Sequence, residues 1–156
     1  MANFDATKGG PAANSYATTD EADDFFELDY TAGEWTNLDD DTKEKLLVTA
    51  ARQIDRLKVK HDKLSAAQAL KFPVDAGQED GFAQAKEACI RQALYIFINQ
   101  DNVDEARAGM IQGVKGESIG PVGKTMTGFN PFAQWAPGVL TLLADFVDLK
   151  MRSQRG

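Results

Sequence analysis

The spacing of apolar residues between positions 41 and 57 is the strongest constraint on what this chain can fold into. Apolar residues recur there at intervals of three and four, a pattern that predicts an amphipathic helix. These residues are Leu46, Leu47, Ala50, Ala51, Ile54 and Leu57. The acidic run 39–41 can cap this helix, with Glu44 three residues after Asp41. A second long helix is predicted from Phe82 to Ile98, with Cys89 on its apolar stripe.

Three further helices are expected. Thr18 and Glu21 form a Thr-x-x-Glu capping box at the start of an acidic helix. Ser65 can cap a short helix that stops before Pro73. A last helix, apolar nearly all round, is predicted from Pro137 to about Met151. The fold class is therefore mainly α, a small bundle of about four to five helices with a Gly-rich hairpin or extended loop and an N-terminal arm.

The domain organisation follows from these elements. Residues 1–14 form the arm, whose single large apolar side chain is Phe4. We expect a neighbouring subunit to hold this arm in place. Residues 15–151 form one helical domain, in which the Gly-rich and aromatic segment 110–136 precedes the last helix, and 152–156 form a tail.

Charge is distributed unevenly along the chain. The net charge is −7; residues 1–45 hold twelve acidic and three basic residues, and the remainder holds twelve and fourteen. Such a chain as a whole would repel a phosphate backbone. The two halves would suit head-to-tail self-association, although an acidic face kept for solubility is the alternative. No apolar run is long enough for a membrane span, and we expect no secretory signal at the N-terminus.

The chain offers little catalytic chemistry. His61 is the only histidine and lies in a polar stretch, and Cys89 is expected to be a buried thiol. Gly123-Lys124-Thr125 resembles the end of a phosphate-binding loop, but Ser118 stands where that motif needs its first glycine. The acidic residues 39–41 lack the spacing of a calcium loop. We therefore expect no enzyme activity, no cofactor and no metal.

Two groups of residues are candidates for partner binding. A basic cluster could contact nucleic acid or a neighbour's acidic half, and consists of Arg56, Lys58, Lys60, Lys63 and Lys71. An aromatic group between Gly and Pro residues could stack on bases or anchor a loop at a protein interface, and consists of Phe129, Phe132 and Trp135. Only Lys124 adds charge near the aromatics, which favours the interface.

A set of short motifs, taken in order along the chain, resembles the tailed-phage head–tail connector (adaptor) proteins. The motifs are Ser15-Tyr16-Ala17, Glu21-Ala22-Asp23, Trp35, Ala50-Ala51-Arg52-Gln53-Ile54-Asp55 and Gln68-Ala69-Leu70-Lys71-Phe72-Pro73. Segments 113–119 and 137–147 are similar to the hairpin and the C-terminal helix of that group. The same sequence group is often labelled DnaT-like single-stranded DNA-binding protein, and this is the alternative function.

The resemblance implies a structural virion protein, a subunit of a homo-oligomeric ring of about twelve copies beneath the portal. Its C-terminal region would dock on the portal, and its other side would receive a neck, stopper or tail protein. DNA would pass through the lumen during retention and ejection, past an acidic face at Asp23, Asp24 and Glu27. The protein would lie at the head–tail interface of the virion, and in the host cytoplasm during assembly. The partner-binding candidates are Phe129, Phe132, Trp135, Phe146, Lys150, Arg152 and Arg155.

Overall fold

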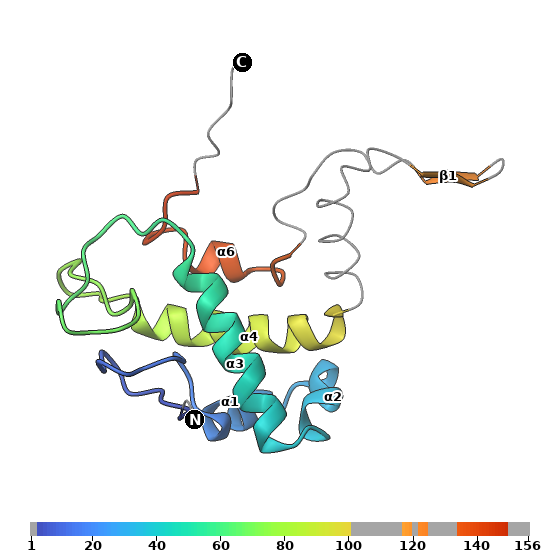
Figure 1. The fold of residues 1–156 in the computed structure, drawn as a ribbon, viewed down its shortest axis with the longest axis horizontal. Coiled ribbons are helices and arrows are strands. Elements are labelled where there is room, and N and C mark those ends of the chain that lie inside the picture. The colour runs from blue at the N-terminus through green and yellow to red at the C-terminus, as the bar shows by residue number, and fades with distance from the viewer. Residues whose placement is uncertain (1–2, 101–116, 120–121, 125–133, 150–156) are drawn as a thin grey trace, which may run out of the picture.

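The computed structural model describes residues 3–100, 117–119, 122–124 and 134–149. The fold is mainly helical, as the sequence predicts, and is shown in Figure 1. The first half holds α1 (Thr19–Phe26), the 3-10 turn η1 (Tyr30–Ala32), α2 (Gly33–Thr36) and α3 (Asp40–Asp55). The second half holds α4 (Phe82–Ile98), the strands β1 (Glu117–Ile119) and β2 (Val122–Lys124), and α6 (Val139–Leu142). Within the described residues no helix combines the length and apolar character needed to cross a membrane.

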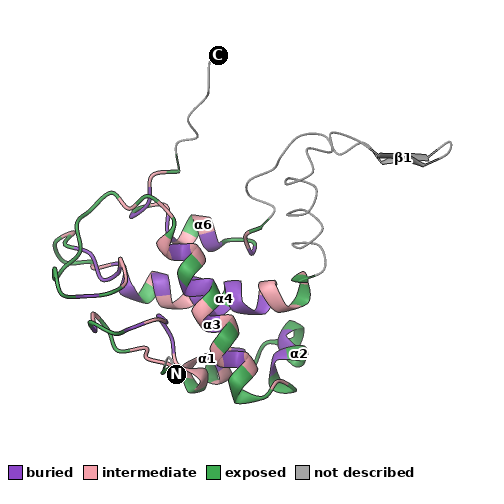
Figure 2. Ribbon diagram, in the orientation of Figure 1, coloured by how far each residue is buried: buried purple, intermediate pink, exposed green. Residues whose placement is uncertain are grey.

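The core forms where α3 packs across α4, and both helices begin and end close to the predicted positions. Small buried residues line the crossing and let the two backbones approach: Ala50, Ala51, Ala85, Ala88 and Ala93. The larger buried side chains Leu47 and Ile54 fill the space beside them. Figure 2 shows buried, purple segments along α4 on both sides of the place where α3 crosses it.

The N-terminal segment is not an arm that needs a neighbour, which corrects the prediction. It folds back on its own chain: the Ser15 amide donates to the Asp5 carbonyl (3.1 Å), and the Ala69 amide donates to the Gly10 carbonyl (3.0 Å). Lys8 forms an ion pair with Asp80 (2.6 Å), and Phe4 packs against the core. The partners in these contacts lie outside residues 1–14, so the sequence of this segment alone does not reveal them.

The predicted short helix after Ser65 is wrong, because residues 65–70 form turns instead. The buried Gln68 side chain accepts from the Ser65 amide (3.0 Å) and donates to the carbonyls of Leu70 (2.9 Å) and Pro73 (2.8 Å). Side-chain bonds of this kind give the backbone an alternative to the helical ladder. The peptide between Phe72 and Pro73 is cis.

The predicted long C-terminal helix is also wrong. Of the described residues 137–149, only Val139–Leu142 is α-helical, after Gly138 at a positive φ of 83°. Residues 143–146 form turns, and Val147 pairs with Val59 in an antiparallel bridge. Hydrogen bonds from the Lys60 amide to Phe146 and from the Asp148 amide to Lys58 complete this pairing (2.8 and 2.7 Å). Phe146 and Val147, beyond α6, are thus buried beside the loop that follows α3 (Figure 1), whereas Leu149 is exposed.

The predicted hairpin is confirmed where the structure describes it. β1 and β2 pair in antiparallel register, with Glu117 opposite Lys124 and Ile119 opposite Val122. The rest of segment 110–136 up to residue 133 and the tail 152–156 lie outside the described residues.

Candidate partner-binding surfaces

An exposed acidic surface lies at the end of the bundle where α1, η1 and α2 meet. Between residues 9 and 42 the chain holds ten acidic residues and no Lys or Arg. Two large apolar side chains stand among them: Leu28 is 96% exposed and Tyr30 is 100% exposed. We define the acidic surface as the exposed residues Asp24, Glu27, Leu28, Asp29, Tyr30 and Glu34.

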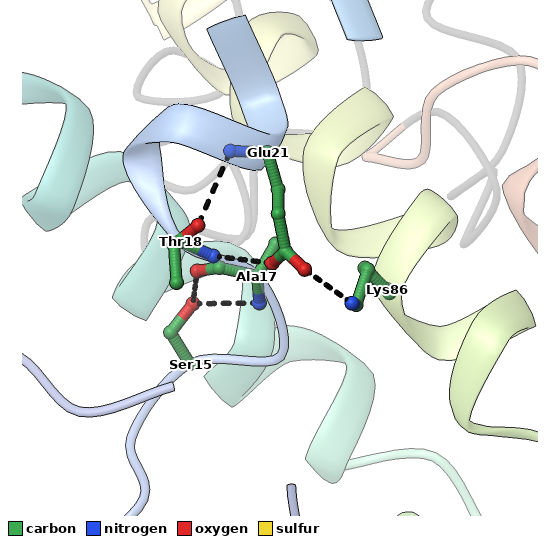
Figure 3. Close-up of polar contacts among 5 residues, drawn as sticks. All are labelled: Ser15, Ala17, Thr18, Glu21 and Lys86. Atoms are coloured by element: carbon green, nitrogen blue, oxygen red, sulfur yellow. Dashed lines mark hydrogen bonds and ion pairs between the residues drawn. The ribbon is translucent and has the colours of Figure 1, made fainter. Parts of the chain in front are cut away.

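The capping box predicted for α1 is confirmed and fixes this helix against α4 (Figure 3). The Glu21 amide donates to the Thr18 hydroxyl (3.2 Å), and the Thr18 amide donates to the Glu21 carboxylate (2.9 Å). Lys86 of α4 forms an ion pair with the same carboxylate. Partial burial raises the pKa of Glu21, but the hydrogen bonds from Lys86 and Thr18 outweigh it and leave the pKa below its usual value. Glu21 is therefore held as a carboxylate.

Asp23 does not face water freely, which differs from the expectation for the acidic face. Its carboxylate accepts from the Trp35 indole (2.8 Å) and pairs with the Lys43 ammonium (2.9 Å). The Lys43 side chain is only 7% exposed, whereas that of Asp23 is 41% exposed. The negative charge of Asp23 is thus compensated within the chain. Asp24 and Glu27 are exposed, as expected.

The turn between α1 and α2 is shaped by Asp29. Its carboxylate accepts from the amide and the hydroxyl of Thr31 (2.9 and 2.7 Å), and these bonds lower the pKa of Asp29. This cap starts η1 and leaves Leu28 and Tyr30 on the outside of the turn. Exposed large apolar side chains grouped in this way are typical of a surface that meets a partner.

Three of the five cationic side chains in the predicted basic cluster donate hydrogen bonds to backbone carbonyls. Lys60 donates to the Ala144 carbonyl (3.0 Å), Lys63 to the Gln68 and Ala69 carbonyls (3.1 and 3.0 Å), and Lys71 to the Leu57 carbonyl (2.8 Å). A carbonyl does not neutralise an ammonium, so the positive charges remain. We define the basic loop as the exposed residues Arg56, Lys58, Lys60 and Lys63.

Acidic residues close to the basic loop reduce its net charge. Asp148 lies 3.7 Å from the Lys58 ammonium, and Asp62 and Asp145 are exposed. The described chain ends at Leu149 beside this loop, and the sequence continues with Lys150, Arg152 and Arg155 and no acidic residue. The loop is consequently a modest positive patch.

The two surfaces lie at opposite ends of α3. Asp39 caps the first turn of α3 near α2, by accepting from the Thr42 amide (2.7 Å), and Arg56 ends the helix near α6 (Figure 1). A helix of 16 residues is about 24 Å long at 1.5 Å per residue. The acidic surface and the basic loop of one chain therefore cannot touch each other.

The structure redistributes the predicted partner-binding residues. Phe146 is buried and packs edge-on against Phe72 at 6.1 Å between ring centres, so it belongs to the core. Trp135 is half-buried against the core. The other candidates, Phe129, Phe132, Lys150, Arg152 and Arg155, lie outside the described residues.

The residues considered for chemistry keep structural roles. His61 is exposed, and Asp39 caps α3. Burial raises the pKa of Cys89 to about 12, and its thiol donates to the Leu47 carbonyl (3.4 Å). Gly123 and Lys124 lie in β2. In the part of the chain that the structure describes, no group of His, Cys, Asp and Glu could hold a metal ion.

Comparison with known proteins places this mainly helical chain in one family. Residues 4–156 match the model of the family described as "Putative DnaT-like ssDNA binding protein", and the chain belongs to that family. Neither a curated protein nor a solved structure matches the chain.

Sequence reasoning missed two features of these surfaces. Leu28 and Tyr30 alternate with acidic residues directly after the end of α1. This alternation indicates exposed apolar side chains, but a search for helical periodicity does not detect it. The second feature is Lys43, because only the fold shows that its ammonium group is buried beside Asp23.

Proposed function

We propose that this protein is a structural subunit of the head–tail connector of a tailed bacteriophage, and not an enzyme. The observation that carries the proposal is the acidic surface, which is exposed and presents Leu28 and Tyr30 to a partner. A surface of this charge repels phosphate, while its apolar centre and charged rim fit a protein partner. The order of motifs along the chain, which resembles connector proteins, supports the same conclusion.

In this proposal copies of the chain form a ring, of about twelve, between the portal and a neck, stopper or tail protein. Asp24 and Glu27 are exposed and form no ion pair with another described residue, which suits either a lumen that lets DNA slide without binding or a contact with a neighbouring subunit. Asp23 contributes less, because Lys43 balances its charge. The protein assembles in the host cytoplasm and ends at the head–tail interface of the virion.

The test is the mass of the protein alone and after mixing with the cognate portal, by light scattering or native mass spectrometry. We expect a complex of ring size only when portal is present or when the protein is concentrated. A protein whose mass is indifferent to portal over the full concentration range would contradict the connector role.

Single-stranded DNA binding is the second candidate, favoured by the family description and by the four exposed cations of the basic loop. If the loop binds phosphates, affinity for an oligonucleotide falls steeply with salt, with a log–log slope of about −0.7 for each phosphate neutralised on a single strand. The double variant Arg56→Glu/Lys58→Glu then loses binding, whereas Lys45→Glu/Arg52→Glu, on the exposed face of α3, retains it. An affinity independent of salt and of both variants would exclude this candidate.

A further inference from the structure

The acidic surface and the basic loop are complementary in charge. The acidic surface has four exposed carboxylates, and the basic loop has four exposed cations within eight residues. Because α3 holds them at opposite ends, no contact between them can form within one chain. Complementary patches that cannot meet within a molecule can meet between molecules.

Both surfaces also carry apolar groups suited to the centre of an interface. Leu28 and Tyr30 project from the acidic surface, and Leu64, which is 56% exposed, follows Lys63 in the basic loop. Exposed tyrosine and leucine surrounded by charges match the usual anatomy of an interface, with an apolar core and a polar rim. Leu64 is held in place because its amide donates to the Pro73 carbonyl (3.1 Å).

We propose that the acidic surface of one copy binds the basic loop of the next copy, head to tail. The contact joins two different patches, so a pair of copies retains one free acidic surface and one free basic loop, to which further copies can bind. Such a contact closes into a ring when the rotation between neighbours permits it, and otherwise extends as a filament. This inference names the contact between subunits and rests on the proposed ring. It places Asp24 and Glu27 at that contact and not in the lumen.

Two charge-reversal variants separate the two patches. Glu27→Lys/Glu34→Lys changes the acidic surface without touching Asp29, which shapes the turn. Arg56→Glu/Lys58→Glu changes the basic loop without touching Lys60 and Lys63, which hold backbone carbonyls. Asp75→Lys/Glu79→Lys and Lys45→Glu/Arg52→Glu are the matched controls, because they make the same changes in net charge at exposed positions outside the residues that define the two surfaces.

Sedimentation velocity at low salt measures the self-association of each protein, and the expected results are as follows. Wild-type protein and both controls self-associate, and association weakens as salt is added. Each charge-reversal variant alone associates about tenfold more weakly or worse. An equimolar mixture of the two charge-reversal variants forms a one-to-one complex that does not grow, because the intact basic loop of one meets the intact acidic surface of the other.

Several results would overturn the contact: wild-type protein that stays monomeric at low salt, variants that associate like wild type, or a mixture that stays monomeric. Circular dichroism checks that each variant is folded, and Tyr30→Ser weakens the same contact without a change of charge. The portal experiment remains independent. Binding of wild type to portal with unchanged assembly of both variants would leave the connector role standing and remove only this contact.

Discussion

Lys43 and Asp23 form an ion pair in which the cation is almost completely buried and the anion is half-exposed. Lys43 comes from the first turn of α3, and Asp23 lies at the centre of α1. The Asp23 carboxylate also accepts from the Trp35 indole, so one side chain links α1, α2 and α3. This link fixes the elements that carry the acidic surface.

Asp23→Asn is expected to lower the free energy of unfolding by about 2 kcal/mol, because it leaves the buried Lys43 ammonium without its counter-charge. Lys43→Met should cost less, since the Asp23 carboxylate then keeps its access to water and its bond from Trp35. Urea unfolding of both single variants and of the double variant measures the coupling. A double variant as unstable as the sum of the two single variants would show that the pair contributes nothing.

Gly81 precedes α4 at a φ of +68°, and a Cβ there would lie 2.9 Å from Cε1 of Phe72 and 3.0 Å from Cδ1 of Phe146. Gly77 also has a positive φ, of +85°, but a Cβ added to Gly77 would meet no other atom within 4 Å. Gly77→Ala should therefore cost only the left-handed backbone term, about 1–2 kcal/mol. Gly81→Ala should cost about 1–3 kcal/mol more, because the added methyl group forces the two rings to move.

Thermal unfolding of both glycine variants gives this comparison directly, since the backbone term is common to them. Equal losses of stability would mean that Phe72 and Phe146 give way without cost. The pair of rings would then be less tightly packed than their edge-on contact indicates.

The elements that were predicted correctly are those whose signals come from residues close together in the sequence. The capping box at Thr18 and Glu21, and the periodic apolar residues of α3 and α4, depend on neighbours within one helix, and all three elements are confirmed. The failures have a different cause. The segment after Leu142 is apolar enough for a helix, but pairing of Val147 with Val59 decides its conformation, and residues 88 apart in sequence give no local signal of pairing.

The candidate surfaces could be predicted only in part. The acidic bias of the first 45 residues and the basic cluster after Ile54 are visible in the sequence, and most residues of both groups are exposed. The sequence could not show that Phe146 is enclosed by Phe72 and Gly81, or that Lys43 balances Asp23. Charge is a property of each residue, whereas burial depends on the whole fold.

Gln92 is a buried polar group on α4 that holds the chain leading into α6. Its amide nitrogen donates to the Gln53 side chain and to the Gln134 carbonyl (both 2.7 Å), and its oxygen accepts from the Ala136 amide (2.8 Å). Gln92→Leu should lower the free energy of unfolding by about 3 kcal/mol, because two backbone groups lose their partner.

Gln84→Leu, half-buried on the same helix, is the matched control and should change stability by less than about 1 kcal/mol. Urea unfolding provides the measurement for both. If Gln92→Leu is as stable as the control, water must replace the lost bonds, and the segment before α6 does not depend on Gln92.

Stability should fall at high pH because of two buried acidic groups, the Cys89 thiol and the Tyr16 hydroxyl. Burial raises the pKa of Cys89 to about 12, and burial with the nearby Asp55 carboxylate raises the pKa of Tyr16 above its usual value. Both groups bind their proton more tightly when folded, so their stabilisation is complete below the unfolded pKa values, near 9 and 10. This stabilisation is lost as pH rises above the unfolded pKa values, by at most about 1.4 kcal/mol per pH unit for each group.

Cys89→Ala removes the contribution of the thiol, so the stability of this variant should decline with pH less steeply than that of wild type between pH 9 and pH 11. Equal slopes in urea titrations would show that the Cys89 thiol ionises as readily in the folded protein as in the unfolded one.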